Sequence, residues 1–249
     1  MTWLDKLKLK YMGDEQMSFT NKLLCYAGKK DFQIDKRISV GYFIRLCWKY
    51  GWMKVRGSLY SFGNKKIQKG LFMGKAVSIV EKKYLTIGSC VKLHDGVYID
   101  ALSIDGVHIG NDVILGRNSR IECTGSLSSI GKGISIGNRT TFGNDCFFGA
   151  AGGIQIGEDV VAGQYIRFHS ENHNFEDTTR LIREQGVSHK GIIIGDNCWI
   201  GSGAVFLDGS EIGDGVVVAA GAVVTRKFPS NVVIGGIPAK ILKSREKKE

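Results

Sequence analysis

The 249 residues are enough for one large domain or two small ones, and charge and glycine are unevenly distributed along them. Residues 1–70 hold 15 basic and 5 acidic residues and 7 of the 34 glycines, which leaves residues 71–249 electrically neutral and rich in glycine. No apolar run approaches the roughly 18 residues of a membrane-spanning helix, and the N-terminus lacks the apolar core of a secretory leader. Six scattered cysteines without CxxC spacing favour buried, reduced thiols over disulfides or a metal site. These features predict a cytoplasmic protein.

The basic segment, residues 1–70, contains one predicted amphipathic helix, Ser39–Gly51, with Ser39 suited to cap its start and Gly51 its end. Four apolar residues share one face at helical spacing: Phe43, Leu46, Cys47 and Tyr50. Basic residues lie in and around the helix: Lys36, Arg37, Arg45, Lys49, Lys54 and Arg56. Two interpretations remain open, a helix packed on the open end of a neighbouring coil or a helix resting on an anionic membrane surface. Without a recognisable binding module, the charge alone does not predict nucleic-acid binding.

From about residue 71 to residue 235 the sequence follows a six-residue repeat, which fits neither the helical period nor the alternation of a hairpin. The repeat is clearest near its C-terminal end, where apolar residues recur at Ile194, Ile200, Phe206, Ile212, Val218 and Val224. Glycines follow many of the apolar residues and suit the corners of a coil. Three repeats make one turn of a three-sided coil, so Ile194 is expected to stack on Ile212. The pattern predicts a parallel β-helix, a fold dominated by β structure.

The repeat is interrupted in two places. Ile121 and Ile130 are nine residues apart, so the extra residues are expected to bulge from a corner before a rung that opens at Ile130. After Phe168 the repeat stops until Ile194, which predicts a protruding loop over residues 169–191. A long stretch without the repeat is more often functional than idle. Residues 236–249 are expected to form a C-terminal tail that folds as a short helix or frays.

With these repeats in view, the chain resembles the hexapeptide-repeat acyltransferases, which have a left-handed parallel β-helix, and in particular the sugar O-acetyltransferase branch. The resemblance covers roughly residues 71–243. It implies transfer of an acetyl group from acetyl-CoA to a hydroxyl, without a resident metal. It also implies a homotrimer in which each active site lies between two coils.

The resemblance assigns catalytic roles to three positions. His173 matches the catalytic histidine and is expected to act as general base; imidazole suits the task because it titrates near neutral pH. The partner of this histidine in the family is often a backbone carbonyl or a carboxylate, for which Glu171 and Glu176 are nearby candidates. The backbone N–H of Ser202, in CWIGSG, is expected to stabilise the oxyanion. Trp199 matches an aromatic residue that lines the acetyl and acceptor site.

Further assignments concern the cofactor and the acceptor. Ser202, Ala220 and Thr225 match positions along which the pantetheine arm lies. The basic residues that match contacts to the phosphates of the cofactor are Arg226, Lys240 and Lys243; the lysines would meet phosphate as point charges. His169 is a candidate for lining the acceptor site.

The sequence thus predicts an acetyl-CoA-dependent O-acetyltransferase that modifies a sugar, in a surface polysaccharide or its lipid-linked precursor. Other small acceptors on the same scaffold remain open, namely an amino sugar, an antibiotic or serine. The alternative that is not an enzyme is a non-catalytic β-helix that serves as a scaffolding module.

Overall fold

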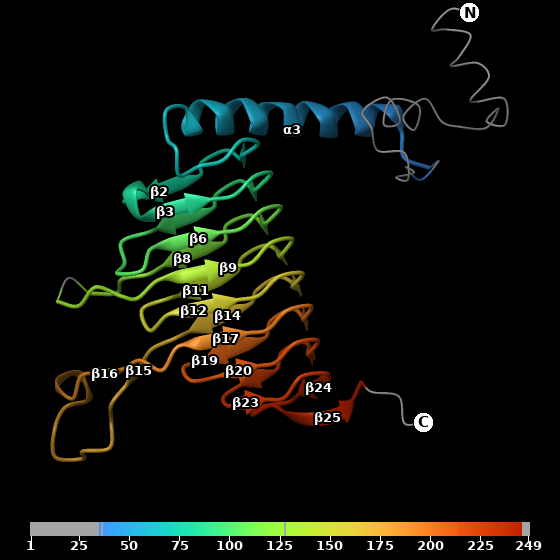
Figure 1. Ribbon diagram of the computed structural model, residues 1–249. Helices are drawn as coiled ribbons and strands as arrows, with labels where there is room; N and C mark the ends of the chain where they lie inside the picture. Colours follow the sequence, from blue (N-terminus) through green and yellow to red (C-terminus); the bar gives the residue numbers. More distant parts are fainter. Residues whose placement is uncertain (1–34, 36, 127, 246–249) are drawn as a thin grey trace, which may run out of the picture. The chain divides into compact units, whose positions relative to one another are not determined.

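The computed structural model describes residues 35, 37–126 and 128–245, so the first 34 residues of the basic segment, Lys36 and the last part of the tail lie outside the described residues. The chain divides into two compact units, and the boundary lies between Trp52 and Met53. The second unit is a three-sided coil of short strands (Figure 1), and each side of the coil is one sheet.

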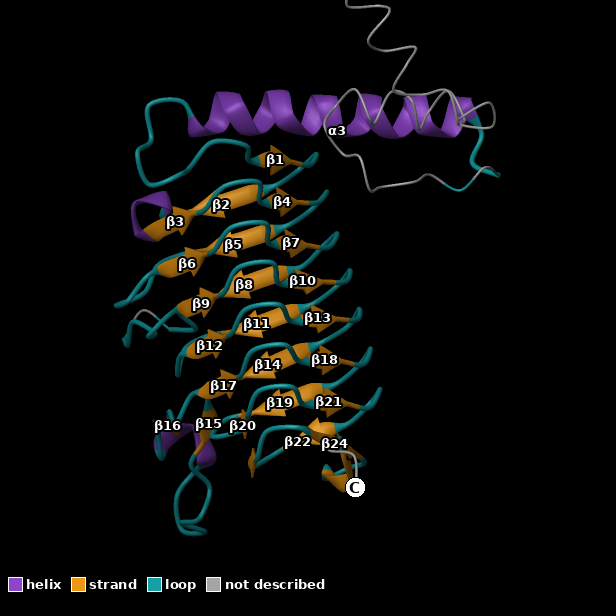
Figure 2. Ribbon diagram, turned by 45° about the vertical axis from the view of Figure 1, so that its right-hand side comes forward, coloured by secondary structure: helices purple, strands orange, loops and turns teal. Residues whose placement is uncertain are grey.

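The strands of each sheet come from successive turns of the coil (Figure 2). Sheet I comprises β1 (Phe72–Met73), β4 (Lys92–Leu93), β7 (Ile114–Leu115), β10 (Thr141–Phe142), β13 (Val161–Ala162), β18 (Trp199–Ile200), β21 (Val217–Val218), β24 (Val232–Gly235) and β25 (Lys240–Ser244). Sheet II comprises β2 (Ser78–Val80), β5 (Tyr98–Asp100), β8 (Arg120–Glu122), β11 (Phe147–Gly149), β14 (Arg167–His169), β19 (Val205–Leu207) and β22 (Val223–Val224). Sheet III comprises β3 (Leu85–Ile87), β6 (Val107–Ile109), β9 (Ile134–Ile136), β12 (Ile154–Ile156), β17 (Ile192–Ile194), β20 (Glu211–Ile212) and β23 (Lys227–Phe228).

The stacking of the turns confirms the predicted parallel β-helix. Ile194 pairs with Ile212 in parallel register. Ile200 pairs with Val218 and Phe206 with Val224 in the same way. Parallel neighbours of this kind require a crossover between them, and the two other sides of the coil supply it.

The inward side chains of the coil form a continuous buried core. Phe168 stacks on Phe206 with ring centroids 4.9 Å apart and on Phe148 at 5.1 Å. Stacked pairs of this kind contribute about 0.5–1.5 kcal/mol beyond the burial of their area. The thiols of Cys146 and Cys198 are buried as predicted, and burial raises the pKa of each to about 11. The expectation of burial is wrong for Cys47 and Cys90, which are exposed on the helix and at a corner of the coil.

Two expectations about the coil are wrong. Ile130 does not open a rung, because its side chain is 48% exposed on the bulge between β8 and β9 and the next strand starts at Ile134. In each three-residue strand of sheet III, the first and the last side chain point inward. Counting nine residues from Ile121 therefore ends in the bulge, before the strand that forms the next rung. In the tail, Lys240–Ser244 is neither helix nor frayed but the antiparallel strand β25, which pairs with β24.

The predicted helix is present as α3 (Val40–Ser61), with the expected start and a different end. The Ser39 hydroxyl accepts a hydrogen bond from the Tyr42 N–H at 3.2 Å, as a capping residue does. The helix continues through Gly51, because a glycine costs only about 1 kcal/mol within a helix and no proline follows it.

The part of α3 from Met53 onward packs on the first turn of the coil. Met53 is fully buried, Gly57 is buried, and the Arg56 Nε donates a hydrogen bond to the Met73 carbonyl at 2.8 Å. The part of α3 beyond the predicted segment Ser39–Gly51 therefore covers the open end of the coil. None of the helices in the described ranges combines the length and the hydropathy needed to cross a membrane.

The two glycines of α3 give a matched test of this contact. A Cβ on Gly57 would lie 1.9 Å from the Leu71 carbonyl oxygen, whereas one on Gly51 would meet nothing within 4 Å. We expect Gly57→Ala to lower the free energy of unfolding by about 1–3 kcal/mol through overpacking, and Gly51→Ala to raise it by up to about 1 kcal/mol. Urea denaturation followed by circular dichroism measures both. Equal effects of the two substitutions would contradict the packing.

Candidate functional site

The projecting loop, residues 170–191, leaves the coil between β14 of sheet II and β17 of sheet III (Figure 1). Where it leaves, the buried Ser170 hydroxyl donates to the Gly149 carbonyl at 2.8 Å and accepts from the Gly152 N–H at 2.9 Å. Where it returns, the buried Asp208 carboxylate accepts from the N–H groups of Lys190 and Gly191 at 2.8 and 2.7 Å. Both ends of the loop are therefore fixed to the coil by hydrogen bonds.

The interior of the loop is ordered by a short antiparallel pair, β15 (Asn172–His173) and β16 (Val187–Ser188). The Asn174 amide donates to the Gln185 carbonyl at 3.0 Å, and the Gln185 amide donates to the Asp177 carbonyl at 2.8 Å. A short 3-10 helix, η2 (Ile182–Glu184), completes the turn. The loop is a built structure that holds its side chains in defined places.

Two histidines of the loop differ in their surroundings. His173, the predicted base, is exposed on β15. The carboxylate of Glu171, one of its two predicted partners, instead lies 2.7 Å from the His189 Nε2. Glu171 therefore pairs with His189, and a contact of Glu171 or Glu176 with His173 stays a prediction. The cause is the antiparallel pairing, which brings residues near the two ends of the loop together and so places Glu171 beside His189.

His169 lies at the end of β14, partly buried, with its ring 5.6 Å from the ring of Phe147. Burial lowers the pKa of His169, and the charge of Arg167 lowers it further. The imidazole therefore favours its neutral form, in which one ring nitrogen accepts a hydrogen bond.

The residues predicted for the acetyl site lie at a different edge of the coil. Trp199 stands on β18 with its side chain 60% exposed, between Val161 and Val217 of the adjacent strands. Ser202 occupies the corner from sheet I to sheet II, where its hydroxyl accepts from the Gln164 N–H at 3.3 Å. Ala220 is at the same corner one turn further along the coil.

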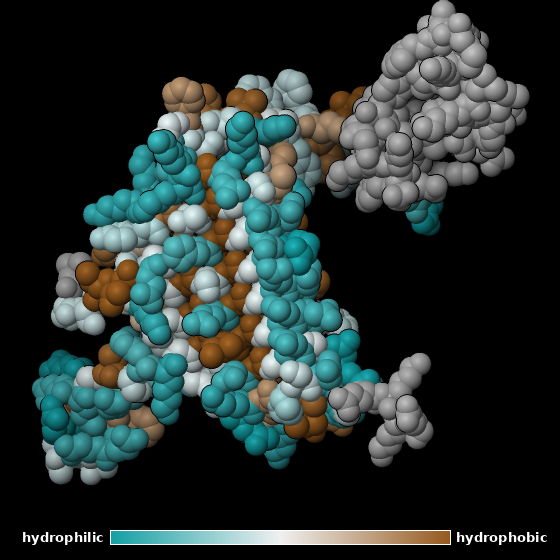
Figure 3. All heavy atoms as spheres, viewed as in Figure 1, coloured by the Kyte–Doolittle hydropathy of each residue, from teal (hydrophilic) through white to brown (hydrophobic). Residues whose placement is uncertain are grey.

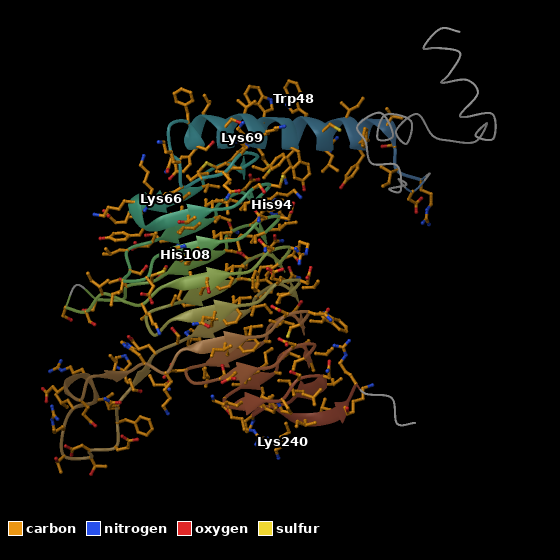
Figure 4. The ribbon with its side chains drawn as sticks, viewed as in Figure 1. Trp48, Lys66, Lys69, His94, His108 and Lys240 are labelled. Atoms are coloured by element: carbon orange, nitrogen blue, oxygen red, sulfur yellow. The ribbon has the colours of Figure 1, made fainter. Side chains whose placement is uncertain are left out.

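The predicted cofactor residues are divided among three places, of which the I/II corner with Ser202 and Ala220 is the first. Thr225 and Arg226 lie at the corner from sheet II to sheet III, and the Arg226 guanidinium is 5.0 Å from the ring centroid of Phe228. Lys240 and Lys243 are exposed on β25, at the C-terminal end of the coil (Figure 4). One chain thus places the loop with His173 at the II/III edge and Trp199, Ser202 and Ala220 at the I/II edge.

A groove of about 270 Å³ lies on the outer face of sheet III beside the base of the loop. Its polar lining includes His108, Lys132, Gln155 and Lys190, and the His108 Nε2 is 2.7 Å from the Asp105 carbonyl oxygen. Figure 4 shows His108 on one turn of the coil, on the outer face. Across the described ranges, no group of three or more potential metal ligands comes together.

Sequence reasoning missed the groove, the Asp208 anchor and the Glu171–His189 pair. The groove forms from four successive turns, so no single motif encodes it. Asp208 carries a weak signal, an acidic residue at a corner one turn after the loop returns. The Glu171–His189 pair depends on the strand register inside the loop, which the repeat does not specify.

Comparison with known proteins agrees with the fold. The family model of the bacterial transferase hexapeptide (six repeats) matches residues 191–226, which run from the end of the loop through two turns of the coil, β17 to β22. A protein of Mycobacterium tuberculosis that is named as an acetyltransferase is 30% identical over 169 residues, which cover 68% of this chain and 52% of the relative. The chain therefore carries the hexapeptide repeat of the bacterial transferases and is similar to proteins that are named as acetyltransferases.

Other proteins to which the chain is similar differ in the reactions that their names state. WbbJ of Escherichia coli, named as an O-acetyl transferase of lipopolysaccharide biosynthesis, is 29% identical over 125 residues, 47% of this chain and 64% of that protein. A mutant of AntD, an N-acyltransferase from Bacillus cereus solved with dTDP-4-amino-4,6-dideoxyglucose and coenzyme A, matches with a TM-score of 0.52 at 17% identity, over 77% of this chain and 90% of that one. That likeness shows the fold alone. The chain spans about half of the mycobacterial relative and less than two thirds of WbbJ.

The depressed pKa of His169 predicts how stability depends on pH. The folded state binds the proton more weakly than the unfolded chain, so the contribution is fully present above the unfolded pKa of about 6.5 and is lost as the pH falls through the lower, folded pKa. We expect the free energy of unfolding to fall between pH 7.5 and pH 5.5, and His169→Gln to flatten that fall. Urea titrations across this range measure it. His108→Gln, which removes an exposed imidazole, is the control and should keep the slope of the unmodified protein.

Proposed function

We propose that the protein is an acetyl-CoA-dependent O-acetyltransferase that works in the cytoplasm on a sugar hydroxyl, in a surface polysaccharide or its lipid-linked precursor. The observation that carries the proposal is a rigid loop, fixed at both ends, that holds His173 outside an otherwise closed coil. The name of WbbJ supports a sugar hydroxyl as acceptor. An amine acceptor on the same scaffold, the acceptor class that the name of AntD states, is the second candidate.

In the proposed reaction the His173 imidazole takes the proton of the acceptor hydroxyl while the oxygen attacks the thioester carbonyl carbon. The backbone N–H of Ser202 donates to the oxyanion that develops, and Trp199 lines the acetyl site. Collapse of the tetrahedral intermediate breaks the carbon–sulfur bond, and the imidazolium returns the proton to the coenzyme A thiolate. The products are an O-acetyl sugar and free coenzyme A.

Direct transfer agrees with the state of the thiols inside the coil. Burial raises the pKa of Cys123 to about 12 and that of Cys146 and Cys198 to about 11, so these groups remain protonated at neutral pH. A protonated, inward thiol is a poor nucleophile, because the thiolate is the reactive form. These three cysteines therefore do not carry an acyl-enzyme intermediate.

A complete site in this proposal needs two copies of the chain in a homotrimer. His173 and the residues around Ser202 occupy different edges of one coil, so a neighbouring copy must bring its loop to the I/II edge. The loop exposes apolar side chains that such a contact would cover: Phe175, Leu181, Ile182 and Val187. Trp199 and Val161 are likewise exposed on sheet I. Figure 3 shows apolar spheres among the polar ones of the loop.

Ala220 at the I/II edge of one copy, with Thr225 and Arg226 at the II/III edge of the copy that supplies the loop, would then bind the pantetheine arm and the phosphates of acetyl-CoA. Lys240 and Lys243 would add positive charge. His169 is proposed to line the acceptor site, where its neutral imidazole can accept a hydrogen bond from a sugar hydroxyl.

The base is tested by two histidine variants of the same loop. With acetyl-CoA and a panel of sugars and amino sugars, we expect His173→Ala to lower kcat/KM for thiol release by about 100-fold or more, because a positioned base contributes 10²–10⁴-fold. His189→Ala removes an imidazole that Glu171 holds, and should cost far less. The reverse ranking would assign the base to the Glu171–His189 pair. Failure of every acceptor, together with no binding of acetyl-CoA, would favour the scaffolding alternative.

The shared site is tested by mixing two inactive variants. His173→Ala lacks the base, and Ala220→Trp fills the proposed pantetheine path at the other edge. If each site combines the loop of one copy with the edge of the next, an equal mixture refolded together should regain roughly a quarter of the unmodified activity, since one site in four receives two intact halves. Each variant refolded alone is the control. A mixture as inactive as its components would show that each chain builds its own site.

A further inference from the structure

The two sides of α3 are chemically different in an unexpected way. One side, with Met53 and Gly57, is buried. Each residue of an α-helix advances by 100° around the axis, and this rotation places an apolar stripe on the opposite side of α3. The stripe continues one residue past the end of the helix. We define it as the outer stripe, with exposed fractions of 60, 69, 48, 48, 73 and 90% for Ile44, Trp48, Trp52, Val55, Leu59 and Phe62. The sequence prediction chose a different face, and it did not include this stripe.

The size and order of the outer stripe are unusual for an exposed helix face. Its members follow one another at intervals of three or four residues, the spacing of a side meant to be covered. Trp48 and Trp52 lie edge to face with ring centroids 5.9 Å apart. Figure 4 labels Trp48 among the aromatic side chains of α3. Contiguous apolar patches of this kind mark sites of interaction.

The charge around the outer stripe identifies the occupant. Residues 37–70 contain eight basic residues and not one acidic residue. Arg45 and Lys49 follow the stripe along one flank of the helix, and Lys54 lies on the other flank. A second copy of the chain would set these positive charges against one another. An anionic surface that also accepts apolar groups is complementary to both features.

We propose that α3 lies flat on an anionic lipid surface, with the outer stripe inserted at the boundary between headgroups and acyl chains. Tryptophan prefers this boundary because its ring is apolar and its N–H can still reach water. The 22-residue helix is about 33 Å long at 1.5 Å per residue, which gives the stripe an extended line of contact. Arg45, Lys49 and Lys54 would reach the phosphates of the headgroups. This inference does not rest on the proposed reaction.

Vesicle sedimentation of the full chain tests the proposal. We expect the protein to pellet with vesicles of phosphatidylglycerol and phosphatidylcholine, and not with phosphatidylcholine alone at physiological salt. Trp48→Ser with Trp52→Ser should reduce partitioning at least about tenfold, since insertion of the apolar side chains supplies the affinity. Arg45→Gln with Lys49→Gln should reduce binding to the anionic vesicles by about tenfold or more.

The controls are matched in chemistry and located outside α3, on the coil, its bulge and the projecting loop. Ile104→Ser with Ile130→Ser removes two exposed apolar side chains, and Arg117→Gln with Arg183→Gln removes two exposed charges. Both should bind as the unmodified protein does, and thermal denaturation should show every variant folded. Absence of binding to anionic vesicles would overturn the proposal, as would binding that survives loss of both tryptophans. A dimer that dissociates in Trp48→Ser with Trp52→Ser would instead assign the stripe to a second copy.

Discussion

The constraint on which the molecule depends is that each turn of the coil must lie in register on the turn before it. Backbone hydrogen bonds run from one turn to the next, as from the Trp199 N–H to the Val216 carbonyl at 3.0 Å. Each inward side chain lies over its counterpart, so Phe148, Phe168 and Phe206 form one column. A shift of one residue would turn the inward side chains outward on all three sheets. Any segment that interrupts the repeat must therefore return the chain to the same register.

The projecting loop meets this requirement through its two anchors. Ser170 satisfies backbone groups of the preceding turn, and Asp208 in the following turn accepts the N–H groups at which the loop returns. Between these points the loop folds on itself, so its internal structure is independent of the coil's period. This separation lets one scaffold present a stable set of side chains outside the prism. The same separation explains why Glu171 and His189, near opposite ends of the loop, meet.

The sequence predicts the periodic coil well and the segments that interrupt it poorly. The pairing of Ile194 with Ile212 could be predicted because a strict period leaves a single register. Ile130 could not be placed, because an apolar residue in a bulge has the same local signature as one that opens a rung. The strand β25 depends on an unpaired edge of β24, a feature of the completed coil rather than of residues 240–244. The site residues were predicted from the resemblance to a family. The structure adds that, within one chain, His173 lies at one edge of the coil and Ser202 and Ala220 lie at another.

The two open ends of the coil explain why a helix, α3, precedes the first turn and an antiparallel strand, β25, follows the last. A parallel β-helix leaves unpaired backbone groups at its first and last turns, and such edges recruit other chains unless they are covered. At the last turn, β25 pairs back antiparallel on β24. At the first turn, the Arg56 side chain donates to the Met73 carbonyl, and Gly57 allows α3 to lie against Leu71 without a Cβ. A covering helix needs only one apolar side for this task. The second apolar side of α3, with its tryptophans and its surplus of positive charge, is therefore not explained by covering the coil and requires a partner of its own.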